Sequence, residues 1–342
     1  MPAPVPAAAA LRSMHAASRS APAALLESLL QQPEASIVLV APHPDDETLA
    51  AGGLLQRARA AGARVSVLLL TDGDNNPWPQ RWLQRRWRID AAARAAWGRR
   101  RRAEALTALI RLGLDPGDLY AFGWPDQGLT ARIQRHLPDT LERLRGLLGV
   151  LRPTLVVAPA LADRHPDHSA ARVLVELALA ASALPRPPLW GFAVHGAAPA
   201  AQPLVLATHE RAAKLRALEA HTSQLALAGG RWRRRVHAGE FYQIQPPPPL
   251  QGDSAAGIAL PWHPVLPGPA ACALLVVAGA QCWQLPWQDG VQSGPLRLRL
   301  RPQPSLEWSA PPPGPLFVKL HSRRRSMWIF DRWGWRQVAA AP

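Results

Sequence analysis

The stretch that decides the fold is VLVAPHPDDETL, at residues 38–49. An apolar run ends there in a histidine and three acidic residues, and a helix-like pattern follows. Titratable side chains at the end of a buried strand indicate a metal site or acid–base chemistry. His43 and Asp46 offer a nitrogen and an oxygen ligand, while Asp45 between them is left for another role. The alternative is a plain turn that caps a helix, because aspartate is favoured there and acids complement the helix dipole.

A second cluster of the same kind argues against that alternative. TLVVAPA at residues 154–160 is another buried-strand pattern, and DRHPDH follows at residues 163–168. Two strand ends, each followed by His-Pro-Asp, predict one site where the carboxyl ends of parallel strands meet. His43, Asp46 and one histidine of the second cluster would supply three ligands and leave one coordination position open. Catalytic zinc sites have this arrangement, whereas structural zinc sites close their shell with four ligands.

Together, HPDDE at residues 43–47 and HPDH at residues 165–168 resemble the PIG-L/LmbE-like family of zinc-dependent N-acetyl-sugar deacetylases. Other family-like features follow in the expected order, and the resemblance covers residues 36–245. These features are Thr71-Asp72-Gly73 after the second strand, Arg101-x-x-Glu104 in a helix, Phe122-Gly123-Trp124-Pro125-Asp126, and Lys214 followed by His221-x-Ser223-Gln224.

The resemblance implies a division of labour within the two motifs. It implies that His43, Asp46 and His168 bind the metal. It also implies that Asp45 acts as the general base and that His165 stabilises the oxyanion and protonates the departing amine. Zn²⁺ is the ion that the resemblance implies, although two histidines and one carboxylate also suit Fe²⁺ or another divalent ion.

Four further residues are expected to support the ligands or to contact the substrate. Asp167 is expected to accept a ring proton from His165 or His168, as carboxylates beside metal-binding histidines do. Glu47 is expected to bind a substrate hydroxyl or to support the site, with a first-turn helix acid as the alternative. Arg101 and Asp126 are expected to contact the substrate, with a solvated helix face and a turn as their respective alternatives.

The order of strand and helix patterns predicts the fold class. Alternating strands and helices indicate a mainly parallel sheet with helices on both faces, and the resemblance makes this a Rossmann-like three-layer α/β sandwich. The expected strands are 37–42, 64–71, 119–124, 154–159 and 189–194, and the expected helices are 46–61, 139–151, 166–182 and 208–225. A further helix is expected to begin at Arg101-x-x-Glu104 and to end near residues 112–113.

The ends of the chain differ from this pattern. Residues 1–35 are rich in Ala and Pro, lack a clean secretory signal, and are expected to be a flexible leader. A stiff linker, QPPPPL at residues 245–250, opens a β-rich accessory region over residues 246–342. Its expected strands are 271–278, 296–300, 316–320 and 326–330. No apolar stretch is long enough to span a bilayer, so we expect a cytoplasmic protein.

Basic charge concentrates in residues 75–102, called here the Arg/Trp segment. The net charge is +15 over 342 residues, and this segment interleaves four tryptophans with many of the arginines. One hypothesis is an insertion or lid that recognises an acidic or lipid-linked sugar, because arginine binds phosphate and tryptophan favours sugars and membrane interfaces. The alternatives are a nucleic-acid surface and a helix with a solvated basic face.

The resemblance therefore implies a metal-dependent hydrolase that removes the N-acetyl group from a GlcNAc-type amino sugar of a glycoconjugate or glycolipid. Its expected partner is that sugar, phosphate- or lipid-linked, with peripheral contact to the inner face of the membrane through residues 78–102. The alternatives are an amidase acting on a non-sugar acyl amide and a non-catalytic glycan- or membrane-binding protein on the same fold.

Overall fold

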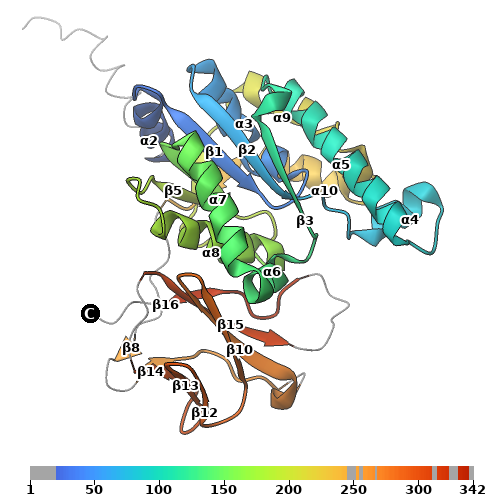
Figure 1. Cartoon of the computed structure of the whole chain (residues 1–342). Coiled ribbons are helices and arrows are strands. Elements are labelled where there is room, and N and C mark those ends of the chain that lie inside the picture. The colour runs from blue at the N-terminus through green and yellow to red at the C-terminus, as the bar shows by residue number, and fades with distance from the viewer. Residues whose placement is uncertain are drawn as a thin grey trace, which may run out of the picture.

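The computed structural model describes residues 21–244, 252–253, 257–265, 268–309, 314–322 and 330–338. An α/β domain lies above a smaller all-β region in the view of Figure 1. The predicted fold class is confirmed: a parallel sheet with helices on both faces is followed by antiparallel β sheets. Within the described ranges, no helix is both long enough and apolar enough to cross a membrane.

The central sheet has five parallel strands in the order β3-β2-β1-β4-β5. The inner strands β2, β1 and β4 are rich in Val, Leu and Ile and are buried on both faces, as in other parallel sheets, whereas the edge strand β3 is partly exposed. The strands are β1 (Ser36–Ala41), β2 (Arg64–Thr71), β3 (Leu119–Trp124), β4 (Leu155–Pro159) and β5 (Leu189–Phe192). Each lies within two residues of its predicted ends.

Alternate side chains of β1 enter two different cores. Ile37 and Leu39 pack on one side with the helices α2, α3, α5, α9 and α10, whereas Val38 and Val40 pack on the other with α6, α7 and α8. Figure 1 shows these two helical layers. The helices are α2 (Ala21–Leu30), α3 (Asp46–Ala60), α4 (Pro77–Gln84), α5 (Ala91–Arg111), α6 (Leu129–Arg135), α7 (Leu137–Leu151), α8 (Pro166–Ala180), α9 (Thr208–Leu218) and α10 (Thr222–Ala238), with a 3₁₀ turn η1 (Pro116–Asp118).

The order of the strands places the two His-Pro-Asp motifs side by side. From β1 the chain runs through α3 to β2 on one side, and it returns later to β4 on the other side of β1. This is the switch point of an open α/β sheet, where ligands bind beyond the carboxyl ends of the strands. HPDDE follows β1 and HPDH follows β4, so both motifs open onto this crevice.

Three predictions need correction. The helix of Arg101 begins at Ala91, where the Asp90 side chain accepts from the backbone N–H of Ala93 and caps it. The single helix expected over 208–225 is two, α9 and α10, with His221 at the start of the second. Part of the expected flexible leader is helical, because Leu26 of α2 is buried in the core.

The C-terminal region forms two antiparallel sheets around an apolar core of their own. Leu275, Val277 and Phe317 point out of that core and join the one that contains α6, α7 and α8. The strands are β6 (Gln202–Leu204) and β7 (Glu240–Tyr242) of the α/β domain, then β8 (Gly252–Asp253), β9 (Gly257–Ala259), β10 (Cys272–Ala278), β11 (Gln281–Pro286), β12 (Val291–Ser293), β13 (Leu296–Arg299), β14 (Ser305–Trp308), β15 (Leu316–Ser322) and β16 (Arg336–Val338), with a 3₁₀ turn η2 (Pro269–Ala271). The expected linker 245–250 and most of the expected strand 326–330 lie outside the described residues.

Candidate active site

Three side chains converge where β1 and β4 end. His43 Nδ1 lies 3.2 Å from His168 Nε2, and Asp46 Oδ2 lies 3.6 Å from the first atom and 3.3 Å from the second. A tetrahedral metal with ligands at about 2.1 Å separates its ligand atoms by about 3.4 Å. The spacing and the two-nitrogen, one-oxygen donor set therefore fit a divalent metal ion.

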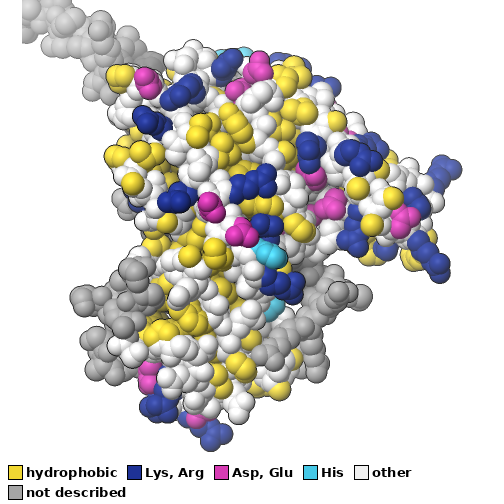
Figure 2. Space-filling model, viewed as in Figure 1, with side chains coloured by type: hydrophobic (Ala, Val, Ile, Leu, Met, Phe, Trp, Pro, Cys, Tyr) yellow, Lys and Arg dark blue, Asp and Glu magenta, His cyan; other side chains and the backbone are white. Residues whose placement is uncertain are grey.

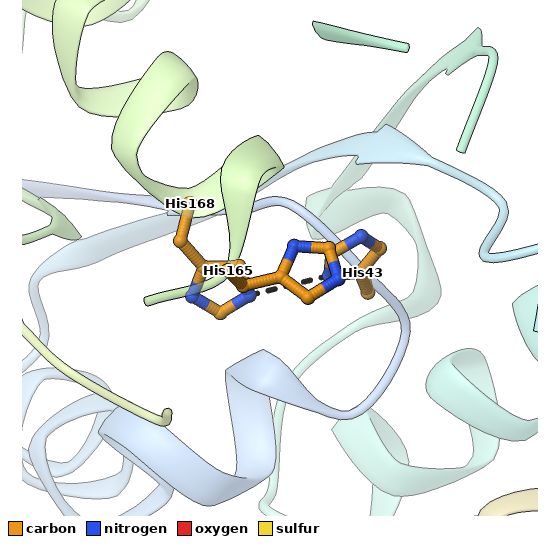
Figure 3. A group of neighbouring side chains, drawn as sticks. All are labelled: His43, His165 and His168. Atoms are coloured by element: carbon orange, nitrogen blue, oxygen red, sulfur yellow. Dashed lines mark hydrogen bonds between the residues drawn. The ribbon is translucent and has the colours of Figure 1, made fainter. Parts of the chain in front are cut away.

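A looser arrangement of donors surrounds this set. His43, His165 and His168 each offer a ring nitrogen within 4.8 Å of the other two (Figure 3). His43 forms a similar group with Asp126 and Asp167. The set that includes Asp46 is tighter, and the His43 backbone N–H donates to Asp46 Oδ2 at 2.8 Å, which fixes that carboxylate.

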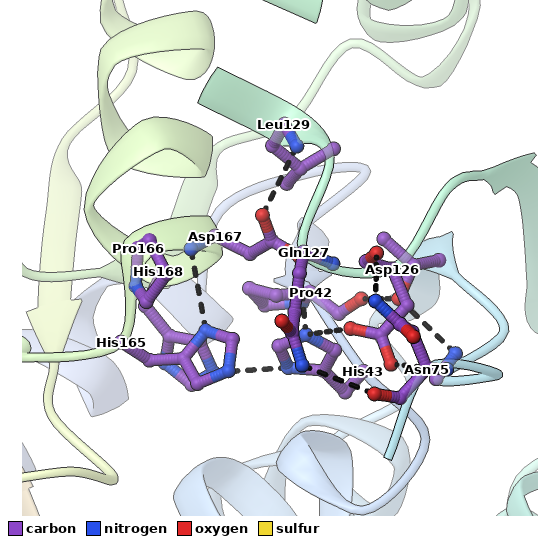
Figure 4. Close-up of polar contacts among 12 residues, drawn as sticks. Pro42, His43, Asn75, Asp126, Gln127, Leu129, His165, Pro166, Asp167 and His168 are labelled. Carbon is purple, nitrogen blue, oxygen red and sulfur yellow. Dashed lines mark hydrogen bonds and ion pairs between the residues drawn. The ribbon is translucent and has the colours of Figure 1, made fainter. Parts of the chain in front are cut away.

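Carboxylates hold the outer nitrogen of each candidate ligand histidine. His168 Nδ1 lies 3.0 Å from Asp163 Oδ2. His43 Nε2 lies 3.2 Å from Asp126 Oδ1 and 3.4 Å from Asp167 Oδ2 (Figure 4). Such carboxylates fix the ring orientation and the tautomer of a metal-binding histidine. The pairing differs from the expected one, because Asp163 rather than Asp167 faces the His168 ring.

The electrostatics of the site favour a bound cation. Burial disfavours charge on His168, but Asp163 and Asp46 outweigh it and raise the pKa of that imidazole to about 10. His43 shows the same balance, with burial opposed by Asp126, Asp167 and Asp46, and its pKa is raised well above the usual value. A pocket that holds protons this strongly stabilises a metal ion in the same place, since both are positive charges.

Asp45 sits in an unusual backbone conformation beside the metal ligands. Its φ is +130°, a sparsely populated value that persists only when the surroundings impose it. The Asp45 carboxylate lies 3.3 Å from Arg101 Nη2. Burial and the nearby Asp46 raise the Asp45 pKa to about 6 although Arg101 opposes the shift. A carboxylate with that pKa can exchange a proton near neutral pH.

Arg101 is buried rather than on a solvated face. Its guanidinium donates to the carbonyls of Gly73 at 2.8 Å and Pro44 at 2.6 Å, so it ties the β2 loop to the first motif. Gly73 has φ +62°, and a Cβ at that position would overlap Arg101 Nη1. The glycine of the Thr71-Asp72-Gly73 feature therefore makes room for this arginine.

Glu47 supports the loop from behind the site. One of its oxygens accepts from the Asp45 backbone N–H at 3.0 Å, and the other lies 2.8 Å from His221 Nε2. A cavity of about 410 Å³ lies over the site, and Glu47 is absent from the described residues that line it. Glu104, the other acid of the family-like features, accepts from Ser223 N at 3.0 Å and from Thr222 Oγ1 at 2.8 Å, and it caps α10.

Asp167 and Asp126 join the site to the loop that follows β3. Asp167 accepts from the backbone N–H of Gln127 at 2.6 Å and of Leu129 at 3.0 Å, and Asp126 accepts from Asn75 N at 2.9 Å. His165 Nδ1 accepts from Asp167 N at 3.2 Å. Burial and the neighbouring His43, His168 and His195 hold the pKa of His165 well below its usual value.

The cavity of about 410 Å³ is lined by His43, Asp45 and His165, together with Arg101 and Asp126. Catalytic candidates lie at its base, and aromatic and basic residues from α4, α10 and the C-terminal region form its walls. It is lined by His43, Asp45, Asn76, Trp78, Pro79, Arg101, Asp126, Gln127, His165, Val194, His195, Gln224, Leu227, Ala228, Arg231, Trp232 and Phe330. Its volume is within the range of small-molecule sites.

His195 belongs to this site, although sequence reasoning treated it as an ordinary histidine. Its ring centroid lies 5.3 Å from that of His165 and 5.1 Å from that of His168, and its backbone N–H donates to Asp163 Oδ2 at 3.1 Å. The position of His195 just after β5, the strand next to β4, was the feature of the sequence that could have indicated its role. Asp163 was also missed, because it precedes the second motif without being part of it.

Comparisons with known proteins agree with the two motifs. Residues 38–179 match the family model described as PIG-L: GlcNAc-PI de-N-acetylase. The chain is 33% identical over 156 residues to the 1D-myo-inositol 2-acetamido-2-deoxy-alpha-D-glucopyranoside deacetylase of Mycobacteroides abscessus, which covers 42% of this chain and 54% of that protein. It is 35% identical over 160 residues to the protein of the same name from Nocardia farcinica, with coverage of 43% and 52%. The chain thus spans about half the length of these curated relatives.

Solved structures resemble the chain more distantly. The conserved protein TT1542 of Thermus thermophilus is 28% identical with a TM-score of 0.45, and the match covers 63% of this chain and 94% of that one. N,N'-diacetylchitobiose deacetylase of Pyrococcus horikoshii is 23% identical with a TM-score of 0.49, and covers 65% and 89%. Over residues 38–179, this chain is therefore similar to the PIG-L family of GlcNAc-PI de-N-acetylases.

Proposed function

We propose that this chain is a metal-dependent N-deacetylase that hydrolyses the acetamide of a GlcNAc-type amino sugar. One observation carries the proposal: a compact His43–Asp46–His168 donor set adjoins a cavity that His43 lines together with Asp45 and His165. The family-model match over residues 38–179 and the names of the relatives support the reaction type.

The proposed ligands are His43 Nδ1, Asp46 Oδ2 and His168 Nε2, and the proposed ion is Zn²⁺. When bound, such an ion lowers the pKa of water and polarises an amide carbonyl. Asp163 supports the ligand set through His168, whereas Asp126 and Asp167 support it through His43. The same donors suit Fe²⁺, so the identity of the ion is part of the test.

Asp45 is the proposed general base. It takes a proton from the attacking water as the water oxygen bonds to the acetamide carbon. Arg101 and the Glu47 contact to the Asp45 backbone hold this carboxylate in place. Its pKa of about 6 leaves it ionised, yet basic, near neutral pH.

His165 is the proposed partner of the leaving group. The C–N bond breaks as His165 delivers to the amine nitrogen the proton that Asp45 removed from the water, which releases acetate and the free amino sugar. The His165 ring has one nitrogen bonded to the Asp167 backbone N–H, which leaves the other free to donate a hydrogen bond to the developing oxyanion. Its burial among other histidines keeps the resting imidazole neutral.

The substrate class follows from the relatives and the cavity. The curated relatives are named for an acetamido-glucopyranoside joined to inositol. A cavity of about 410 Å³ holds a monosaccharide and part of its neighbour. We accordingly propose residues 36–245 as the deacetylase domain and residues 246–342 as an accessory region.

Acetate release tests this function. We expect the full-length protein to release acetate from N-acetylglucosaminyl inositol. Chelation of the metal should abolish this activity, and added Zn²⁺ or Fe²⁺ should restore it. Asp45→Asn is expected to lose at least about 100-fold in kcat, as loss of a general base does. Asp139→Asn, a change to an exposed acid in the first turn of α7, is the matched control. Activity that survives both chelation and Asp45→Asn would sink the mechanism, and release only from non-sugar amides would favour the amidase alternative.

The Arg/Trp segment is the proposed membrane contact. Trp78, Trp82 and Trp87 are 58%, 67% and 77% exposed, and the Arg81 guanidinium lies 5.1 and 5.3 Å from the ring centroids of the first and third. Figure 2 shows basic side chains over the protruding end that contains α4. Tryptophan favours the membrane interface and arginine is attracted to anionic lipids, so this end fits the surface of a cytoplasmic leaflet. The fourth tryptophan of the segment, Trp97, is fully buried in the fold.

Vesicle sedimentation separates the membrane hypothesis from its alternatives. We expect binding to vesicles rich in phosphatidylglycerol and not to neutral phosphatidylcholine vesicles. The double variant Trp82→Ala/Trp87→Ala should weaken binding, whereas Val150→Ala, which changes an exposed apolar residue on α7, should not. Binding to RNA in preference to anionic vesicles at the same salt would favour the nucleic-acid surface, and binding to neither would leave a solvated helix.

A further inference from the structure

A second cavity of about 300 Å³ adjoins the reaction cavity. The two share five lining residues: Val194, His195, Arg231, Trp232 and Phe330. The second cavity is completed by Arg164, Gly196 and Arg235. A group that occupies it is therefore next to His195, one residue layer away from the proposed leaving-group histidine.

Positive charge in this cavity is not balanced by its described lining. Arg164, Arg231 and Arg235 line it, and no acidic side chain does so among the described residues. Within the described part of the chain, none of these three arginines forms an ion pair. Buried acids such as Asp163 lie behind the wall and are already bonded to His168 and to backbone N–H groups.

Arg235 is only partly satisfied by the protein. One of its terminal nitrogens donates to the carbonyl of Ala193, and its Nε is buried with no hydrogen-bond partner. Burial and the nearby Arg231 lower its pKa, while Asp163 and Asp46 oppose that shift. Because Nε is inaccessible to solvent, an anion in the cavity would be held by the terminal nitrogens of this half-buried guanidinium.

The C-terminal region supplies the outer wall of this cavity. The Phe330 ring centroid lies 5.4 Å from that of His195 and 5.6 Å from the Arg164 guanidinium. Asp331 N donates to the Arg164 carbonyl at 2.9 Å, and the Asp331 carboxylate pairs with the buried Lys319 of β15. Lys319 also donates to the Trp333 carbonyl at 2.8 Å, so the segment that carries Phe330 is fixed to the β sandwich.

We infer that this second cavity is a subsite for an anionic group, a phosphate ester or a carboxylate, that the substrate carries beside its acetamido sugar. Arginine forks bind such groups through paired N–H donors, and Phe330 together with Trp232 excludes water from them. A volume of about 300 Å³ admits a phosphate and a few further atoms but not a nucleic-acid strand. The inference rests on the proposed deacetylase function and assigns the accessory region a part in substrate selection.

Matched substrates test the subsite. Three N-acetylglucosamine derivatives differ only at the anomeric position: the neutral methyl glycoside, the 1-phosphate and the carboxymethyl glycoside. We expect the wild-type protein to favour one or both anions in kcat/KM. Arg231→Ala should reduce that preference by about 10- to 100-fold, the worth of a hydrogen-bonded charge pair. The preferred anion distinguishes the phosphate from the carboxylate, and Arg235→Lys serves as a second variant that keeps the charge.

Arg234→Ala is the control, because it removes an exposed arginine of the same helix that does not line the cavity. Equal kcat/KM for all three substrates, or an anion preference that Arg231→Ala leaves intact, would overturn the inference.

A binding measurement distinguishes failure of the subsite from failure of the proposed reaction. Inorganic phosphate is titrated into the full-length protein by calorimetry, in parallel with Arg231→Ala and Arg234→Ala. Binding that Arg231→Ala weakens at least tenfold and that chelation leaves in place supports the subsite even if no substrate is deacetylated. Binding that chelation abolishes, or that Arg231→Ala does not change, places the phosphate elsewhere and overturns the inference.

Discussion

Replacing Asp163 with asparagine tests whether the acid before the second motif organises the metal site. Its Oδ2 accepts three hydrogen bonds, from His168 Nδ1 at 3.0 Å, Val194 N at 2.7 Å and His195 N at 3.1 Å. Its Oδ1 accepts from His165 N at 2.9 Å. An asparagine has one acceptor oxygen and one NH₂ group, so at least one of these donors would face another donor.

The expected magnitude follows from the charge that is lost. Asp163 is the largest of the effects that favour positive charge on His168 against burial, and it aligns the proposed ligand Nε2 of that ring. Removing such a partner usually costs about 10- to 100-fold in metal affinity or activity. We therefore expect Asp163→Asn to weaken Zn²⁺ binding by that factor.

Competition with a chromophoric chelator measures the metal affinity without relying on turnover. Circular dichroism and thermal melting show whether the variant is folded, and Asp139→Asn is again the matched control. A folded Asp163→Asn protein that binds Zn²⁺ within about threefold of the wild type would refute the role given to this carboxylate, because a supporting carboxylate is worth at least about tenfold.

Three other substitutions probe the surroundings of the site and the core. Gly73→Ala should displace Arg101, because the added Cβ would overlap Nη1 of that arginine. We expect the folded variant to lose more than about tenfold in kcat/KM, and unchanged kinetics would contradict this. Lys214→Met should leave Glu240 buried without its 2.6 Å partner. Urea titrations should show a free energy of unfolding lower by about 3–5 kcal/mol. A decrease below about 1 kcal/mol would show that the pair is not needed for stability. Leu26→Ala should cost about 2–4 kcal/mol because Leu26 is 1% exposed, and Leu25→Ala, at a residue 44% exposed, should change stability little; equal effects would show that α2 is not anchored.

The central sheet could be predicted from sequence because its strands are short, mainly apolar runs. The expected ranges 64–71 and 119–124 coincide with β2 and β3 at both ends. Each run ends at polar or turn-forming residues, so both the period and the boundaries were visible. The two motifs then followed the strands, and their meeting at the switch point followed from the order of a parallel sheet.

Features that depend on contacts between distant segments were harder to predict. The first turns of α5 were missed because arginines hide a helical period in which only Ala93, Trp97 and Gly98 are buried before Arg101. The break between α9 and α10 has no Gly or Pro to announce it, and Glu104 from another helix caps the second. His195 lacked a partner in its own segment, since its neighbours come from the end of β4, from α10 and from the C-terminal region.

The shared packing of Leu275, Val277 and Phe317 with α7 and α8 has a consequence for how the molecule unfolds. Cutting the chain before β10 would strip these three side chains from a face of the α/β domain and leave an apolar area open to water. Such surfaces promote aggregation. The two parts should therefore melt in a single cooperative transition, and the N-terminal part produced alone should be poorly soluble even though it contains every proposed metal ligand.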